Sequence, residues 1–326
     1  MVQARSIGRR ASQVVSRAPL CGSLLACFDR VWDLAADGGE ILALAWEPMV
    51  EGPFNILLAR KPGPALPAGT RFFISGTYLS FGSPAICSIE LSGAVLWDPS
   101  PDWKALRERS DAVRGHLPVL AALLAGEADK PGSAISAGGM SLDGGGWVQS
   151  CERRAESLIG QVIAAHRDGD GRALSSAVAA LCGLGPGLTP AGDDWLAGWL
   201  VALWLAQDLR LDLARQAVSG AAARTTLLSA AFLDCAVEGE IDARWQLLLC
   251  ALAWGTDDQV ASTGRAVVGQ GATSGQAMLA GFLAGIQPAS ASPSSAYPGC
   301  KSSHVPQTGM FSGERVRTPG YHLFLP

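Results

Sequence analysis

The chain has 326 residues and a formal net charge of −4 at pH 7, with 48% hydrophobic and only 17% charged residues. This length and composition indicate a globular protein of more than one domain rather than a disordered chain. A net negative charge without a basic stripe gives no basis for nucleic-acid binding, and the longest apolar run, residues 195–206, is too short to span a bilayer.

The cysteines and histidines exclude several kinds of site. Eight cysteines are scattered along the chain without a Cys-x-x-Cys pair, so we expect buried free thiols and a cytoplasmic location. Only four histidines occur, and none lies in the glycine-rich motifs described below. The chain therefore offers little material for a histidine-based zinc site or a Ser-His-Asp triad.

The N-terminal part of the chain has the pattern of a β domain. Residues 1–18 carry four arginines and no acidic residue, and we expect them to form a flexible N-terminus. Residues 19–100 contain short apolar runs separated by turn signals, which predict a small antiparallel β-barrel or sandwich. The expected strands cover residues 41–46, 55–60, 70–75, 85–90 and 94–97.

Helical periodicity replaces this pattern near Trp103 and predicts a larger, mostly α-helical domain over residues 101–287. Helices are expected over residues 103–127, 147–167 and 172–184, and others begin near Pro190, Leu211, Ile241, Asp257 and Ser274. Residues 288–326 are rich in Ser, Pro and Gly, so we expect an irregular or disordered tail. The predicted fold class is thus α+β.

Two stretches of the helical domain, residues 185–200 and 269–283, are similar to each other. Each is a glycine-rich turn followed by an apolar helix with a glycine inside it, Gly198 or Gly281. Glycines permit positive φ angles, and the first turn of a helix leaves its N–H groups unpaired, so each stretch predicts an anion-binding surface. Because a glycine inside a helix usually marks close backbone approach, we expect the two helices to cross there and the two turns to face one site.

The first stretch contains a pair of adjacent acids. Thr189 is expected to cap the helix and Pro190 to be its first residue, with Asp193 and Asp194 in the first turn, where the helix dipole favours acids by about 0.3–1 kcal/mol. This structural role explains one aspartate but not a second one in an apolar helix. Adjacent helical residues point about 100° apart, so one carboxylate should face the interior and require a donor or a cation. Mg²⁺ with a phosphate, a substrate amide and a buried arginine are the candidate partners, and the choice between the two aspartates stays open.

The other candidate residues lie in two further segments. The second stretch lacks carboxylates, and its Thr273 and Ser274 fit a simple helix cap as well as a binding site. Arg224 suits a clamp for a carboxylate or phosphate, or equally a partner for one of the aspartates. The candidate catalytic residues are Asp193, Asp194 and Arg224. The candidate substrate- or phosphate-binding residues are Gly185, Gly187, Thr189, Gly192, Thr225, Thr226, Ser229, Gly271, Thr273, Ser274 and Gly275.

The strings GLGPGLTPAGDD (residues 183–194) and GATSG (residues 271–275) resemble those of the AllH family, a bacterial family long classed as a domain of unknown function. Its named member is a subunit of the anaerobic oxamate carbamoyltransferase of allantoin breakdown. The resemblance runs from about Pro19 to Ile286 and includes residues 97–99 and 224–229. It implies carbamoyl transfer between carbamoyl phosphate and oxamate, and it implies that the enzyme needs other subunits.

On this resemblance, the glycine-turn N–H groups would hold phosphate and the second helix N-terminus would polarise the carbonyl group. Arg224 would hold the oxamate carboxylate, and the inward aspartate would orient or deprotonate the amide. Two other functions stay open: a non-catalytic binding or assembly subunit, and a stand-alone Mg²⁺-dependent phosphate-transfer enzyme. We expect no cofactor other than Mg²⁺. The expected partners are other subunits and a small-molecule substrate, with neither nucleic acid nor membrane.

Overall fold

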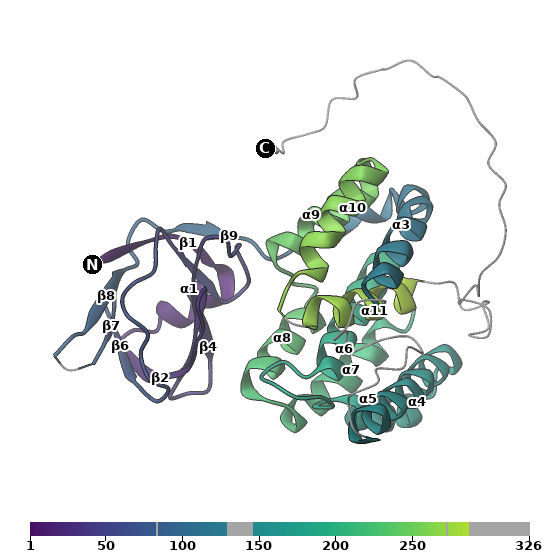
Figure 1. Cartoon of the computed structure of the whole chain (residues 1–326), viewed down its shortest axis with the longest axis horizontal. Coiled ribbons are helices and arrows are strands. Elements are labelled where there is room, and N and C mark those ends of the chain that lie inside the picture. The colour runs from purple at the N-terminus through teal and green to yellow at the C-terminus, as the bar shows by residue number, and fades with distance from the viewer. Residues whose placement is uncertain (83, 129–145, 272, 287–326) are drawn as a thin grey trace, which may run out of the picture. The chain divides into compact units, whose positions relative to one another are not determined.

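Figure 1 shows a computed structural model of the chain, which describes residues 1–82, 84–128, 146–271 and 273–286. The expected tail, residues 288–326, lies outside the described residues. The described part consists of an N-terminal β-barrel and a C-terminal helical region. The predicted α+β class is therefore confirmed.

The barrel closes through the first strand. The strands are β1 (Val2–Gly8), β2 (Leu20–Cys27), β3 (Val31–Ala36), β4 (Ile41–Trp46), β5 (Asn55–Leu58), β6 (Arg71–Ser75), β7 (Tyr78–Phe81), β8 (Cys87–Glu90) and β9 (Val95–Trp97). Their order is β5-β4-β3-β2-β6-β7-β8-β1, and β1 also pairs with β5, so eight strands form a closed ring to which β9 is added. Most pairs are antiparallel, but β1 pairs with β8 and β9 in parallel, and so does β4 with β5. The expected antiparallel barrel or sandwich is thus a barrel with some parallel pairs.

The first eighteen residues belong to the barrel and do not form the expected flexible N-terminus. Val2–Gly8 is strand β1, in which only Gln3 and Arg5 are exposed, and α1 (Arg9–Val15) follows it. The prediction of a flexible segment rested on arginines such as Arg9 and Arg10, which have no acidic residue near them in the sequence. In the structure both pair with the buried carboxylate of Glu240, and the Arg9 Nη2 to Glu240 Oε1 distance is 2.7 Å. The partner of these arginines lies in the helical region, so the N-terminal sequence alone does not reveal it.

Strand β4 is buried on both faces. Leu42, Leu44 and Trp46 belong to the barrel core. Ile41 and Ala43 point the other way and pack with Leu228, Cys235 and other residues of the adjoining helix. The two buried faces explain why this strand is a continuous hydrophobic run rather than an alternating one.

The helical region is built around one helix that is apolar apart from two acids in its first turn. Its helices are α2 (Trp103–Arg107), α3 (Ser110–Ala128), α4 (Gly146–Asp168), α5 (Gly171–Leu181), α6 (Ala191–Ala206), α7 (Leu211–Ala221), η1 (Ala222–Arg224), α8 (Leu227–Val237), α9 (Ala243–Trp254), α10 (Asp257–Val268) and α11 (Ser274–Ile286). The helix expected over residues 103–127 is divided into α2 and α3. Helix α6 is buried around almost its whole circumference, as expected for a central helix.

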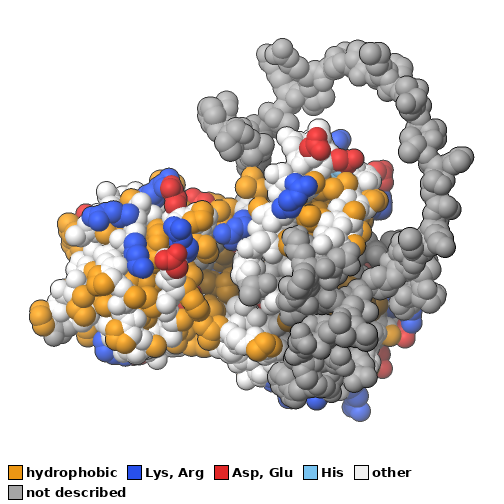
Figure 2. All heavy atoms as spheres, viewed as in Figure 1, with side chains coloured by type: hydrophobic (Ala, Val, Ile, Leu, Met, Phe, Trp, Pro, Cys, Tyr) orange, Lys and Arg blue, Asp and Glu red, His pale blue; other side chains and the backbone are white. Residues whose placement is uncertain are grey.

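The surface charges and the lengths of the helices bear on what the chain can bind. On the face shown in Figure 2, basic and acidic side chains of the described residues lie interspersed rather than gathered by sign. None of the helices in the described ranges is long and apolar enough to cross a membrane.

Helices α6 and α11 cross at the two interior glycines of the repeated motif. A Cβ atom added to Gly198 would lie 1.8 Å from the carbonyl oxygen of Met278. A Cβ atom added to Gly281 would lie 2.0 Å from the carbonyl oxygen of Trp195. Both distances are far below van der Waals contact, so each glycine lets the backbone of the other helix approach. The predicted crossing of the two helices is confirmed.

Alanine at either crossing glycine should destabilise the helical region. For Gly198→Ala and Gly281→Ala we expect the free energy of unfolding to fall by about 2–3 kcal/mol, because the added methyl group forces two packed helices apart. The matched control is Gly220→Ala in α7, where an added Cβ meets no atom within 4 Å. That exposed helical position should gain about 0.5–1 kcal/mol from the better helix former. Urea unfolding followed by circular dichroism measures all three, and equal effects at the three positions would contradict the close crossing.

Candidate functional site

The turn between α5 and α6 has a backbone that requires glycine. Gly183, Gly185 and Gly187 have φ angles of 76°, 125° and 94°. A Cβ atom at Gly183 would also lie 2.6 Å from the carbonyl oxygen of Arg224, and one at Gly185 would lie 2.9 Å from the amide nitrogen of Ala191. Gly187 faces open space, and residues 185–188 are exposed. The turn is thus fixed against the helical region at its start and open to solvent at its tip.

The start of α6 differs from the expected cap. Pro190, not Thr189, occupies the N-cap position, and no side chain caps the helix. The N–H groups of Asp193 and Asp194 bond to the Pro190 carbonyl oxygen, and the Gly192 N–H donates to Leu184. Most N–H groups in the first turn of α6 are therefore already hydrogen-bonded to backbone carbonyl oxygens. The N–H groups of Gly185 and Gly187, by contrast, have no hydrogen bond within the described ranges, so free donors lie in the exposed turn rather than at the helix end.

Asp193 points into the protein and has its hydrogen bonds satisfied by uncharged groups. It is 1% exposed. Its Oδ1 accepts from the Gly183 N–H at 2.8 Å, and its Oδ2 accepts from the Ser229 hydroxyl at 2.8 Å and from the Thr225 hydroxyl. These donors come from the glycine turn, from α8 and from the segment before α8. The Asp193 carboxylate therefore joins three segments that are distant in sequence.

Asp194 is also buried, but its carboxylate is not satisfied. It is 7% exposed, and its Oδ2 has no hydrogen-bond partner among the described residues. Burial raises the pKa of Asp194 from 3.8 to about 7; interaction with the Ser274 hydroxyl lowers it, and the charge of Asp193 raises it further. The two adjacent acids thus have different environments, and the raised pKa of Asp194 places the protonation change of this carboxylate near neutral pH.

The second glycine turn meets the first at this point. The Thr189 and Ser274 hydroxyl oxygens lie 3.0 Å apart, which confirms that the two turns lie together. Ser274 is the first residue of α11, and the Thr273 carbonyl oxygen accepts from Ala277 N–H at 3.1 Å. The Thr189 hydroxyl thus contacts the other turn instead of capping its own helix.

The remaining glycines of the motifs serve the backbone. Gly271 has a φ angle of 65°, which a turn requires. A Cβ atom at Gly275 would lie 1.9 Å from the Val267 carbonyl oxygen, and one at Gly192 would lie 2.2 Å from that of Leu181. Gly192 and Gly275 are therefore close-packing positions, although their place in the motifs predicted a role in binding.

Arg224 is exposed beside the glycine turn, at the end of η1. No hydrogen bond or ion pair joins its side chain to any of the described residues, and the expected alternative of an ion pair with Asp193 or Asp194 is not found there. The neighbouring Thr226 is the N-cap of α8: its Oγ1 accepts from the Ser229 N–H at 3.0 Å and donates to the Leu188 carbonyl oxygen. Among the described residues, the Arg224 guanidinium therefore has no partner.

Cys182 lies against the site and was not singled out from the sequence as a site residue. Its thiol donates to the Ala221 carbonyl oxygen at 3.3 Å. Burial and the neighbouring Asp193 raise the pKa of Cys182 to about 12, although Arg224 opposes this rise. The thiol therefore stays protonated at neutral pH and is a poor nucleophile.

These contacts lie in one continuous part of the chain. Residues 181–286 match the family model of the oxamate carbamoyltransferase subunit AllH. The match confirms the resemblance over these residues, which run from the end of α5 to the end of α11 and include every candidate site residue. The barrel lies outside the AllH match. No curated protein and no solved structure matches the chain.

The side chains that can bind a metal ion were compared for their positions in the structure. In the part of the chain that the structure describes, no group of three or more His, Cys, Asp and Glu side chains is placed to hold a metal ion. The candidate site is therefore described by its hydroxyl groups, its two carboxylates, its free turn N–H groups and one arginine.

Proposed function

We propose that the chain is a subunit of an oxamate carbamoyltransferase-like enzyme and that Asp194 lies in its substrate site. The AllH match supports the first part. The observation that carries the second is a carboxylate 7% exposed, with one oxygen that has no partner among the described residues, at the junction of the two glycine turns. An unpaired buried carboxylate is costly, and a ligand that supplies a donor removes the cost.

The reaction needs a base, an anion site and a carboxylate clamp. The oxamate amide nitrogen attacks the carbonyl carbon of carbamoyl phosphate; a C–N bond forms, the C–O bond to phosphate breaks, phosphate leaves with the bonding electron pair, and the amide nitrogen loses a proton. A carboxylate with a pKa of about 7 is suited to accept that proton near neutral pH. In this proposal Asp194 is the base.

The other groups bind the two substrates. The free N–H groups of Gly185 and Gly187 are donors for the phosphate oxygens. The Arg224 guanidinium, without another partner among the described residues, forms paired hydrogen bonds to the oxamate carboxylate. Asp193 is a positioning residue, because its hydrogen bonds to Gly183, Thr225 and Ser229 hold the turn beside the segment that carries Arg224.

The Arg224→Gln substitution tests the substrate clamp. Since Arg224 is exposed and unpaired within the described residues, its loss should change the free energy of unfolding by less than about 0.5 kcal/mol. The loss of a charged hydrogen-bonding partner should raise the KM for oxamate about 10- to 100-fold. The matched control is Arg172→Gln at the start of α5, another exposed arginine. Steady-state kinetics of the enzyme reconstituted with its other subunits gives both constants.

If the KM for oxamate were unchanged in Arg224→Gln, Arg224 would not bind the oxamate carboxylate. If substitutions of both Arg224 and Asp194 left turnover unchanged while the subunits still assembled, the chain would be a non-catalytic subunit. That outcome would contradict the proposed site but not the proposed membership of the complex.

A further inference from the structure

A buried base such as Asp194 needs a route by which its proton reaches solvent. In the proposed reaction the carboxylate accepts a proton from the oxamate amide, and it must lose this proton before the next turnover. The side chain is 7% exposed, and its Oδ2 is buried without a hydrogen-bond partner among the described residues. Bulk water therefore has little direct access to the protonated carboxylate, so other side chains must carry the proton.

Two hydroxyl groups lead from Asp194 toward the surface. The Ser274 hydroxyl interacts with the Asp194 carboxylate and opposes the rise of its pKa. The Ser274 Oγ lies 3.0 Å from the Thr189 Oγ1, and either oxygen can be the donor of that hydrogen bond. Both residues are partly exposed, and Thr189 follows directly on residues 185–188, which are exposed. The three groups thus connect a buried carboxylate to the open side of the glycine turn.

Helix capping and helix packing do not explain this pair of hydroxyls. Pro190 is the N-cap of α6, which no side chain caps, and Ser274 is the first residue of α11. Close backbone approach at Gly198 and Gly281 already packs the two helices together. A hydroxyl is both a donor and an acceptor, so two adjacent hydroxyls can pass a proton along by exchanging these roles.

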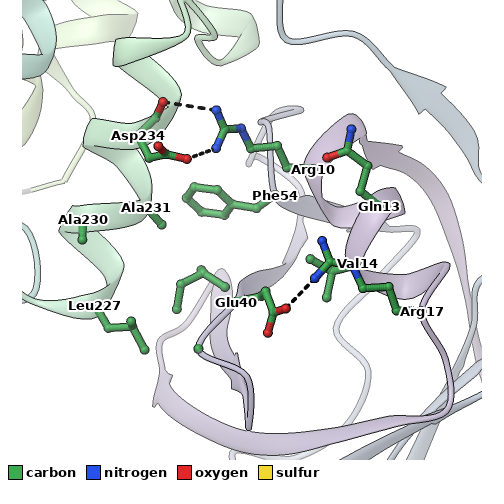
Figure 3. A pocket seen from close by; sticks show the side chains of 12 residues that line it. Arg10, Gln13, Val14, Arg17, Glu40, Phe54, Leu227, Ala230, Ala231 and Asp234 are labelled. Carbon is green, nitrogen blue, oxygen red and sulfur yellow. Dashed lines mark hydrogen bonds and ion pairs between the residues drawn. The ribbon is translucent and has the colours of Figure 1, made fainter. Parts of the chain in front are cut away.

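The cavity beside α8 has a different character. Its volume is about 380 Å³, and residues of α1, β4 and α8 contribute to its lining (Figure 3). Its charged side chains already have partners, since Arg10 pairs with Asp234 and Glu240, and Arg17 pairs with Glu40 at 2.6 Å. The described charged groups of this lining are therefore paired, in contrast to the unsatisfied carboxylate at the glycine turns.

We propose that Ser274 and Thr189 form a proton relay between Asp194 and solvent. This inference rests on the proposed function, in which Asp194 is the base. The Asp194 O–H bond breaks as its proton moves to the Ser274 oxygen, the Ser274 hydroxyl proton moves to the Thr189 oxygen, and the Thr189 hydroxyl proton moves to water. Each hydroxyl oxygen gains one O–H bond and loses one, so only Asp194 changes its charge. Both residues act through Asp194 and are positioning residues for its proton.

Ser274→Ala tests the contact with Asp194 in the full-length chain, without any activity measurement. Because the Ser274 hydroxyl lowers the Asp194 pKa and burial raises it to about 7, the variant should have a still higher pKa, with the contribution of Asp193 unchanged. A raised pKa gives stability that is present at low pH and is lost as pH rises through the pKa of the folded state. The fall in the free energy of unfolding should therefore shift to higher pH, as measured by urea unfolding from about pH 5 to pH 9. The matched control Ser175→Ala, an exposed serine of α5, should keep the wild-type pH dependence.

Thr189→Val tests the outer half of the relay, because valine keeps the shape of threonine and lacks the hydroxyl. In the reconstituted enzyme we expect kcat to fall about 10- to 100-fold with the KM of both substrates unchanged, since the proton leaves Asp194 more slowly. Ser274→Ala should have the same effect, whereas Thr189→Ser retains the hydroxyl and should keep most of the activity. Imidazole, a small diffusible base, should restore part of the lost kcat at constant pH. The matched control is Thr263→Val in α10, whose hydroxyl bonds within its own helix.

The outcomes separate the relay from the proposed function. If Asp194→Asn keeps wild-type turnover, the proposed function fails and the relay fails with it. If Asp194→Asn is inactive while Thr189→Val and Ser274→Ala keep the wild-type kcat, the relay is wrong and the proposed base stands. A raised KM with unchanged kcat would mean that the hydroxyls bind substrate, and a lowered kcat without rescue by imidazole would mean that they only hold the turns together. Either result overturns the relay, and so does an unshifted pH dependence of stability in Ser274→Ala.

Discussion

Asp194→Asn is expected to stabilise the folded chain above pH 7 and to remove most of its activity. Burial raises the pKa of Asp194 from 3.8 to about 7, so folding favours the protonated acid. The stability linked to this group is fully present below about pH 4 and is lost as pH rises through about 7. Asparagine carries no such penalty, and we expect a gain of about 2–4 kcal/mol in the free energy of unfolding at pH 8.

The same substitution should lower kcat by a factor of about 10²–10⁴, the usual contribution of a general base. In the wild-type enzyme, kcat/KM should rise with pH through an apparent pKa near 7, because the carboxylate form is required. This rise should be absent from the residual activity of the variant. Urea unfolding at pH 5 and pH 8, together with pH–rate profiles of the reconstituted enzyme, gives both readouts. A variant that is active and no more stable at pH 8 would contradict the proposed role.

Asp193→Asn should have the opposite effect on stability, although the two acids are neighbours. The Asp193 Oδ2 accepts hydrogen bonds from the hydroxyl groups of Thr225 and Ser229, and an amide placed there presents N–H donors to other donors. The site is 1% exposed, so water cannot replace the lost acceptor. We expect a loss of about 3–5 kcal/mol in the free energy of unfolding, measured by urea unfolding at pH 7.

Ser229→Ala is the control for that experiment. It removes one of the donors to Asp193 and leaves the carboxylate its other two, so its cost should be about 1 kcal/mol. A loss below about 1 kcal/mol for Asp193→Asn would show that this acid only complements the helix dipole. In that case the three segments would be held together by packing rather than by the carboxylate.

Several features of this protein follow from local sequence. Helices α6, α7, α10 and α11 begin close to the predicted residues because Pro, Gly and apolar spacing act within one or two turns. The two similar stretches predicted the crossing of α6 and α11, since a glycine inside an apolar helix has few explanations besides close approach. Positive φ angles in the first glycine turn could likewise be predicted from the sequence, because residues other than glycine rarely adopt that backbone conformation.

The roles of individual side chains, in contrast, depend on contacts between segments that are distant in sequence. From the sequence alone, the choice between Asp193 and Asp194 stays open, because both fit the first turn of a capped helix. The partners of Asp193 lie on η1–α8 and in the glycine turn, and no local pattern reveals which carboxylate they reach. Thr189 was expected to cap α6 but contacts Ser274, the first residue of α11.

Strand β1 was not predicted, and the reason is again that its partners are distant in sequence. The first residues alternate as a strand does, but their partners β5, β8 and β9 lie far along the chain, and the arginines after them pair with Glu240. Helix starts and glycine turns depend on residues a few positions apart, so the local sequence is enough to predict them. Strand pairing, ion pairing and the choice of a satisfied carboxylate depend on residues that only folding brings together.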